Sequence, residues 1–231
     1  MNGAAPSARR LLAVDGVDGS GKSVLADELM EALREAGVTP VLFRVDDFRR
    51  PIDWLQAGRV EADVYYEDYY DLALLDRCLT EFVAGAAAVE LPVFDSKLER
   101  HVGRRSVPLR DATLAVVEGV FALRVPAVAT SAAVIYLRTS FAEAERRILA
   151  RDTARGRTVA DVSHRITARY FPAQERYARA CDPLGRADAI VDHERLGAPV
   201  VVRVDDARLG ADVAAALARA VGAFAPPGGV G

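Results

Sequence analysis

The stretch AVDGVDGSGKSVLADELMEAL, residues 13–33, passes from an apolar run through a glycine-rich turn into a pattern with helical spacing. Within it, residues 16–23 match G-x-x-x-x-G-K-[ST] at every fixed position. The backbone amides of such a turn point inward and cradle phosphate oxygens, and the positive end of the following helix faces the same oxygens. The stretch therefore predicts a nucleoside triphosphate site between a strand and a helix.

The lysine of this turn stands out because the chain carries 30 basic residues and only Lys22 and Lys97 are lysines. A lysine is a compact charge on a flexible stem, which reaches the β- and γ-phosphates better than the planar fork of an arginine. The hydroxyl of Ser23 is placed to bind Mg²⁺. The predicted nucleotide-binding residues are Gly16, Asp18, Gly19, Ser20, Gly21, Lys22, Ser23 and Val24.

The composition is that of an ordinary globular domain, with 51% hydrophobic and 27% charged residues in a chain of 231. A net charge of −3 argues against a nucleic-acid partner, and the two cysteines are too few for a disulfide framework. No apolar run has the length of a membrane span, and RRLLAV is interrupted too early for a signal peptide. We therefore expect a cytoplasmic protein with a small-molecule substrate, and a homo-oligomer is left open.

Strand-like and helix-like stretches alternate along the chain, which predicts an α/β fold with three layers and a mainly parallel sheet, taken here as five-stranded. The strand candidates are 10–14, 38–45, 114–118, 132–137, 187–193 and 199–204. The helical candidates are 23–37, 68–85, 140–156, 159–180 with an interruption at Pro172, and 206–224. We expect one domain over residues 1–225, with an irregular flap at about 85–112, a lid at about 147–158 and a loose C-terminal tail at 226–231.

Three classes of protein use such a phosphate-binding turn: small-molecule kinases, GTPase switches and ATP-driven motors. The sequence contains no guanine-reading N-K-x-D segment and has little room for the further domains of a motor. A kinase needs an acidic residue that orients the acceptor hydroxyl and arginines that close over the transferred phosphoryl group. Both features are present.

Two acidic residues follow apolar strands, at the edge of a parallel sheet where ligands bind. Asp46 follows the second predicted strand, where a carboxylate can accept a hydroxyl proton and aim the oxygen in line; Asp47 is the second choice. The alternative for Asp46 is a cap on the turn. Glu118 ends the strand LAVVE, where it would support Mg²⁺, and its alternative is a surface acid that begins a loop.

Arg147, Arg151 and Arg155 fall at i, i+4 and i+8, and therefore on one helical face. Three like charges repel unless an anion lies between them, and a triphosphate near its transition state supplies that anion. The alternative is a solvated face balanced by nearby acidic residues. The predicted catalytic residues are thus Asp46, Lys22, Arg151 and Arg155, and Arg147 is predicted to bind the nucleotide.

The ordered motifs resemble the uridine kinase family, whose relatives include phosphoribulokinase and bacterial pantothenate kinase. The resemblance covers most of residues 11–195 and rests on GVDGSGKS, VDDFRRP, YYEDYYD, LPVFD, VVEGVFAL, RDTARGR and RYFPAQERYARACDPLGRADAIVDH, in that order. It implies a P-loop kinase fold of the NMP-kinase type, ATP with Mg²⁺, and phosphoryl transfer to a primary hydroxyl. The acceptor that it favours is the 5′-hydroxyl of uridine or cytidine.

Matched motif by motif, the resemblance places Asp46 at the general-base position, Glu118 at the acid that supports Mg²⁺, and Arg157 beside the other lid arginines. Tyr65 stands where nucleoside-specific members carry an aspartate that binds the ribose diol, and Asp63 lies two residues away. The substrate-binding residues predicted from motifs and resemblance together are Asp47, Tyr65, Tyr66, Phe94, Asp95, His101, Tyr170 and Gln174.

Several alternatives stay open at this point. The tyrosines at 65, 66, 69 and 70 can stack on a base, or they can pack the start of a helix against the sheet. The acceptor can be pantothenate, a sugar or a natural product instead of a nucleoside. The alternative of another class is a nucleotide-binding regulatory switch with little turnover.

Overall fold

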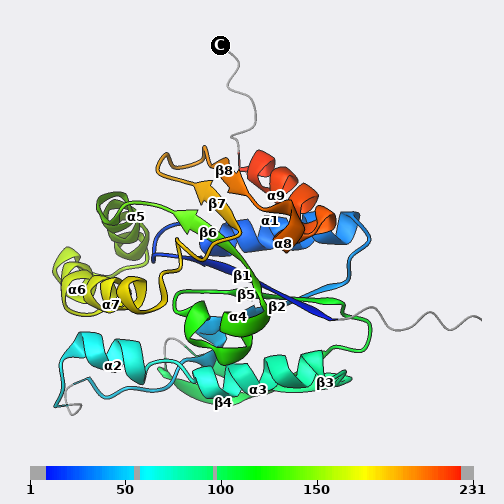
Figure 1. The fold of residues 1–231 in the computed structure, drawn as a ribbon. Helices are drawn as coiled ribbons and strands as arrows, with labels where there is room; N and C mark the ends of the chain where they lie inside the picture. The colour runs from blue at the N-terminus through cyan, green and yellow to red at the C-terminus, as the bar shows by residue number, and fades with distance from the viewer. Residues whose placement is uncertain (1–8, 55–57, 96–97, 225–231) are drawn as a thin grey trace, which may run out of the picture.

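The computed structural model describes residues 9–54, 58–95 and 98–224, and the predicted tail at 226–231 lies outside them. In this part of the chain the main sheet has six strands in the order β2-β5-β1-β6-β7-β8 (Figure 1). The predicted three-layer α/β fold with a mainly parallel sheet is confirmed. The predicted number of five strands is wrong, because the chain returns from β7 through a hairpin that adds β8 as an antiparallel edge strand.

The central strands pair in parallel. β1 (Arg10–Gly16) lies between β5 (Leu114–Glu118) and β6 (Ala133–Arg138), and β2 (Pro40–Arg44) pairs with β5 on the outer side. β7 (Ala189–Asp192) pairs with β6, and β8 (Val200–Val204) with β7. All five residues of β5 are buried, as expected for a strand covered on both faces.

Helices cover both faces of this sheet (Figure 1). On one face lie α1 (Lys22–Glu35), α8 (Asp206–Leu209) and α9 (Ala211–Ala223), which bury Leu29 and Leu217 against the strands. On the other face lie α3 (Leu72–Val83) and α4 (Pro126–Ser131), where Phe82 and Phe121 are fully buried. None of the helices described is both long enough and apolar enough to cross a lipid bilayer.

The segment expected as an irregular flap is instead an antiparallel hairpin, in which β3 (Ala88–Asp95) pairs with β4 (Arg100–Pro108). Eight of the nine residues of β4 are exposed and Val107 is buried. A strand without a buried face shows no hydrophobic alternation, which is why the sequence pattern did not reveal it.

Helices form in the regions where the sequence predicts them, but their boundaries differ from the predicted ones. A helix was expected over 68–85, but α2 (Glu61–Glu67) ends before it, and α3 begins only after Asp71, whose carboxylate accepts the amide of Leu74 at 3.0 Å. α5 (Phe141–Ala154) begins after Ser140, whose hydroxyl accepts the amide of Glu143 at 3.2 Å. Two short 3₁₀ segments, η1 (Val45–Phe48) and η2 (Ala122–Arg124), follow β2 and β5.

The region 159–180 contains α6 (Val159–Arg165), the π-helical segment η3 (Ile166–Tyr170) and α7 (Phe171–Cys181). The predicted interruption at Pro172 is wrong, because this proline lies in the first turn of α7, where a missing amide hydrogen is tolerated. The irregularity lies just before it, in the wider turn of η3.

Candidate active site

The glycine-rich turn joins the carboxyl end of β1 to α1. Gly19 and Gly21 have φ angles of 79° and 98°, in the left-handed region that glycine adopts without strain. A Cβ atom on Gly19 would lie 2.8 Å from the carbonyl oxygen of Ala144 in α5. The ammonium of Lys22 donates to the carbonyl oxygen of Val17 at 2.9 Å, so the lysine folds back across the turn. The turn thus has the shape of a phosphate cradle with a cation beside it.

A buried carboxyl group supports the start of the turn. Asp15 is fully buried and accepts hydrogen bonds from the amide of Gly16, at 2.6 Å, and from the hydroxyl of Tyr177 in α7. That hydroxyl also accepts the amide of Leu123 at 3.0 Å. Burial raises the pKa of Asp15 to about 6, although the two hydrogen bonds oppose the shift.

Helix α7 also holds the middle of the turn. The amide of Asp18 donates to Oε1 of Gln174 at 3.0 Å, and Nε2 of Gln174 donates to Oδ2 of Asp18 at 2.7 Å. The hydroxyl of the buried Tyr65 donates to the same carboxylate oxygen at 3.1 Å. Gln174, which was predicted to bind substrate, is 2% exposed and orients Asp18.

Arg147 supports the turn from behind. It is 8% exposed, and its guanidinium donates to the carbonyl oxygens of Ser20, at 3.3 Å, and His193, at 2.6 Å. Its Nε donates to Glu143 at 2.7 Å. Nδ1 of His193 donates to the carbonyl of Ser20 at 2.7 Å, and burial lowers the pKa of this histidine. The three arginines predicted on one face therefore differ in role, because Arg147 satisfies protein carbonyls.

Ser23 and Glu118 lie together at the end of β5. The hydroxyl of Ser23 donates to Oε1 of Glu118 at 3.2 Å, and Arg44 donates to Oε2 at 3.1 Å. Burial raises the pKa of Glu118, whereas the positive charge of Lys22 lowers it. Among the described residues no group of three or more metal-ligating side chains exists. A hydroxyl and one carboxylate fit Mg²⁺, which takes its remaining ligands from phosphates and water.

Asp46 lies in η1, directly after β2. Its Oδ1 accepts the hydroxyl of Tyr70 at 3.1 Å, and its Oδ2 forms an ion pair with Arg49. Its side chain remains 56% exposed, so these contacts orient the carboxylate without covering it.

The lid arginines Arg151 and Arg157 are both bound by Asp152, an acidic residue of the same segment. Asp152 is 3% exposed; its Oδ1 accepts Nε of Arg151 at 2.7 Å and its Oδ2 accepts Arg157 at 3.1 Å. Burial opposes the shift, but the hydrogen bond from Arg151 holds the pKa of Asp152 below its ordinary value. Within the described residues Arg155 has no ion-pair partner.

Two cavities open on these side chains. The phosphate-loop cavity, of about 630 Å³, is lined by the turn, Glu118 and residues of α5. The aromatic cavity, of about 500 Å³, is lined by the rings of Trp54, Tyr65, Tyr69, Tyr70, Phe94 and Tyr170, together with several arginines. Asp18, Asp46, Arg151 and Arg155 line both cavities, so these four residues stand where the two meet.

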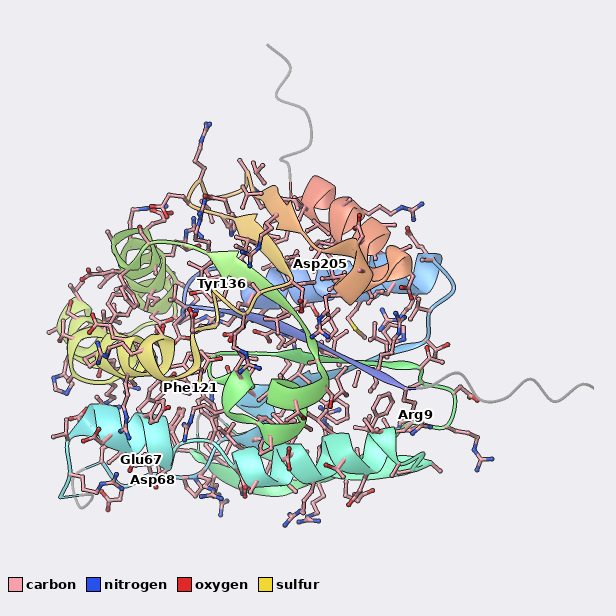
Figure 2. All side chains as sticks on the ribbon, in the orientation of Figure 1. Arg9, Glu67, Asp68, Phe121, Tyr136 and Asp205 are labelled. Atoms are coloured by element: carbon pink, nitrogen blue, oxygen red, sulfur yellow. The ribbon has the colours of Figure 1, made fainter. Side chains whose placement is uncertain are left out.

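Phe121 lies between α7 and α2 (Figure 2), and its ring contacts several rings of the aromatic cluster. Its ring meets those of Tyr65, Tyr70 and Tyr177 edge-on, with centroid distances of 5.5, 6.1 and 5.3 Å. Phe121 has a φ of 70°, which is uncommon for a bulky residue, and its ring is fully buried. Tyr65, Tyr69 and Tyr70 therefore pack in the aromatic cluster and also line the aromatic cavity, whereas Tyr66 does not line it.

Five predicted substrate residues line neither cavity: Asp47 and Tyr66, together with Asp95, His101 and Gln174. Asp47 pairs with Arg105 of the hairpin at 2.8 Å. Tyr66 lies beneath two guanidinium groups, with the Cζ atoms of Arg124 and Arg176 at 3.8 and 4.3 Å from the ring centroid. The structure thus uses Tyr66 to hold α2 against η2 and α7.

The LPVFD motif forms the end of β3, and its last two residues have different surroundings. Phe94 lines the aromatic cavity, whereas Asp95 accepts the amide of Leu98 at 2.9 Å in the hairpin turn. His101 stands edge-on to Phe94, with ring centroids 5.6 Å apart, and its Nε2 donates to the carbonyl oxygen of Arg49 at 2.8 Å. His101 therefore positions the aromatic wall from outside.

The family model for the phosphoribulokinase / uridine kinase family matches residues 11–196. The chain belongs to this family. The resemblance noted in the sequence is thereby confirmed, and it places the chain among the P-loop kinases. A comparison with curated protein sequences finds no significant match.

Solved structures agree on the fold. A possible uridine kinase from Bacillus stearothermophilus is 25% identical, with a TM-score of 0.61 and coverage of 81% of this chain and 90% of that one. A protein assigned as a fructose transport system kinase, from Silicibacter sp. TM1040, is 22% identical, with a TM-score of 0.62 and coverage of 76% and 88%. The second likeness shows the fold alone.

Proposed function

We propose that this chain transfers the γ-phosphoryl group of ATP to a hydroxyl group of a small molecule bound in the aromatic cavity. The observation that supports this most directly is the junction of the two cavities at Asp46, Arg151 and Arg155. A nucleotide on the glycine-rich turn would end its phosphate chain at this junction, and an acceptor would enter from the other side. Direct transfer requires that geometry.

Asp46 is the proposed general base. Tyr70 and Arg49 bind its two oxygens and so fix the plane of the carboxylate. Phosphoryl transfer passes through a loose transition state, so the main contribution of Asp46 is to orient the acceptor oxygen in line and to receive its proton late. The ion pair with Arg49 is compatible with that role, because strong basicity is not required.

Lys22, Arg151 and Arg155 would stabilise the negative charge of the transition state. Lys22 would exchange its contact with Val17 for the phosphates, and the lid arginines would donate to the migrating group. Ser23 and Glu118 would hold Mg²⁺, which neutralises charge between the β- and γ-phosphates when bound. Closure of the lid would exclude water and limit hydrolysis of ATP.

A nucleoside is a specific candidate for the acceptor, because several aromatic rings line the cavity. Trp54 and Tyr69 lie with ring centroids 5.7 Å apart, and Phe94 and Tyr170 face the same space. Aromatic faces are general platforms for bases. The 5′-hydroxyl of uridine or cytidine is therefore one proposed acceptor, beside pantothenate, a sugar or a natural product, and the likeness to a possible uridine kinase supports it.

The test is product formation. The purified protein is incubated with Mg²⁺, ATP and a panel of nucleosides, pantothenate and sugars, and phosphorylated products are identified by mass spectrometry. Asp46→Asn is expected to lower kcat by about 10²- to 10⁴-fold while ATP still binds. Asp47→Asn is the matched control, because Asp47 pairs with Arg105 and lines neither cavity.

A uridine or cytidine monophosphate product would establish the nucleoside assignment. Loss of ATP binding in Asp46→Asn would contradict the role given to Asp46. ATP binding without any product, and without an effect of Asp46→Asn, would favour a regulatory switch over a kinase.

A further inference from the structure

The aromatic cavity is rich in guanidinium groups. Seven arginines line it among the described residues, and two of them, Arg151 and Arg155, also line the phosphate-loop cavity, where a triphosphate would engage them. The other five reach the aromatic cavity alone: Arg49, Arg50, Arg157, Arg165 and Arg169. These donors lie beyond the phosphate site, on the side where the acceptor would bind.

Four carboxylates line the same cavity among the described residues: Glu99 and three that are already engaged. Both oxygens of Asp46 are bound by Arg49 and Tyr70, and both oxygens of Asp152 by Arg151 and Arg157. Asp18 receives two hydrogen bonds on one oxygen. With seven guanidinium groups against four carboxylates, three of them engaged, a ligand that enters this cavity meets more donors than acceptors.

Three of these arginines pair with carboxylates that do not line the cavity, and Arg50 does so with Asp71 at 3.0 Å. Nε of Arg169 pairs with Glu61, and Nε of Arg165 pairs with Asp161 at 3.1 Å. Within the described residues, the two terminal nitrogens of Arg169 have no hydrogen-bond partner. The ion pair between Nε and Glu61 thus balances the charge of Arg169. The N–H groups of its two terminal nitrogens remain available to a ligand.

Neighbouring groups fix the position of the Arg169 side chain. It is 9% exposed, lies in the π-helical segment η3, and stacks with its Cζ atom 3.9 Å from the ring centroid of Trp54. Single-turn π segments are rare and often mark functional sites. Stacking fixes the plane of the guanidinium, and a fixed fork with two free donors matches the geometry of a carboxylate or a phosphate.

We propose that the acceptor of this kinase carries an oxyanion, a carboxylate or a phosphate, which Arg169 binds with help from Arg165 while the hydroxyl lies at Asp46. The inference rests on the proposed function and narrows its substrate class. A neutral nucleoside would displace water from the terminal nitrogens of Arg169 without offering them an anion, which costs free energy when the ligand covers them.

The protein contains its own probe for this site, because Trp54 is the only tryptophan of the chain and stacks on Arg169. The full chain is first saturated with Mg²⁺ and a non-hydrolysable ATP analogue, so that the phosphate-loop cavity is filled. Tryptophan fluorescence is then followed while inorganic phosphate, glycerate or neutral glycerol is added. We expect a saturable change with phosphate or glycerate and none with glycerol.

Variants test whether the fluorescence change depends on Arg169. Arg169→Gln is expected to weaken oxyanion binding about tenfold or more, because it removes charge-assisted hydrogen bonds to the oxyanion. Affinity for the ATP analogue should not change. Arg179→Gln is the matched control, because Arg179 is 73% exposed on α7 and lines neither cavity. Arg165→Gln serves as a second variant if Arg169→Gln fails to fold.

The outcomes separate this inference from the proposed function. The oxyanion site is overturned if neither phosphate nor glycerate gives a saturable change. It is also overturned if Arg169→Gln and Arg165→Gln give the same change as the unmodified protein.

The product assay gives a second test of the oxyanion requirement, with pairs of acceptors that differ in the anionic group: pantothenate against pantothenol, and ribose 5-phosphate against ribose. Efficient turnover of uridine or of the neutral members leaves the kinase function standing and removes the oxyanion requirement. Phosphate binding without phosphorylation of any acceptor supports the site and counts against the function.

Discussion

The buried carboxyl group of Asp15 has a consequence for how stability depends on pH. Its pKa is about 6 in the folded protein, against an ordinary value of 3.8. Between these values the folded state holds a proton that the unfolded state has released, so stability falls as the pH rises through this range. A difference of about 2.2 pKa units corresponds to about 3 kcal/mol for the complete titration.

The substitution Asp15→Asn removes this titration and keeps the volume of the side chain. The free energy of unfolding would be measured by urea titration for both proteins between about pH 4.5 and 7.5, a range that contains about 2 kcal/mol of the effect. We expect the unmodified protein to lose that amount relative to Asp15→Asn as the pH rises. Other titrating groups are common to both proteins and cancel in the difference.

A second variant tests the cause of the shift. The hydroxyl of Tyr177 donates to Asp15 and holds its pKa down, so Tyr177→Phe should move the transition to higher pH. A stability difference between the unmodified protein and Asp15→Asn that stays flat with pH would refute the reasoning. It would mean that Asp15 keeps the same protonation in the folded and unfolded states.

Two further predictions concern the support of the glycine-rich turn. Arg147→Lys is expected to weaken binding of an ATP analogue about tenfold or more, measured by calorimetry, because a lysine cannot serve the carbonyls of Ser20 and His193 together. Unchanged affinity would show that Arg147 is not needed to shape the turn. Burial lowers the pKa of His193, so the stability that its neutral form contributes is lost as the pH falls through the folded-state pKa. In unfolding measurements on the acid side, His193→Gln should lack this loss, and an identical acid profile in both proteins would contradict it.

Sequence reasoning reached those parts of the site that depend on neighbours in the chain or on general rules of sheet topology. The turn at 16–23 is specified by glycines that adopt left-handed φ angles and by the fixed spacing to Lys22. Asp46 and Glu118 were placed at one edge because the carboxyl ends of parallel strands meet there. The cap at Ser140 was also predictable, since it depends on contacts within one turn of helix.

Other parts of the site were not predictable, because their contacts join residues that are remote in sequence. Asp15 and Tyr177 are 162 positions apart, and Arg169 pairs with Glu61 across 108. The regular spacing of Arg147 and Arg151 indicated a common face but carried no information about depth, and depth decided that Arg147 binds protein carbonyls.

The sequence by itself determined the family, the phosphate-binding turn and the order of strands and helices that carries it. These depend on local backbone preferences and on hydrophobic periodicity, which short segments express alone. Only the tertiary structure decided which arginines face the aromatic cavity, which carboxylates balance them, and that Trp54 stacks on Arg169. Burial and pairing arise when distant segments pack together, and they determine which polar groups remain free to bind a ligand.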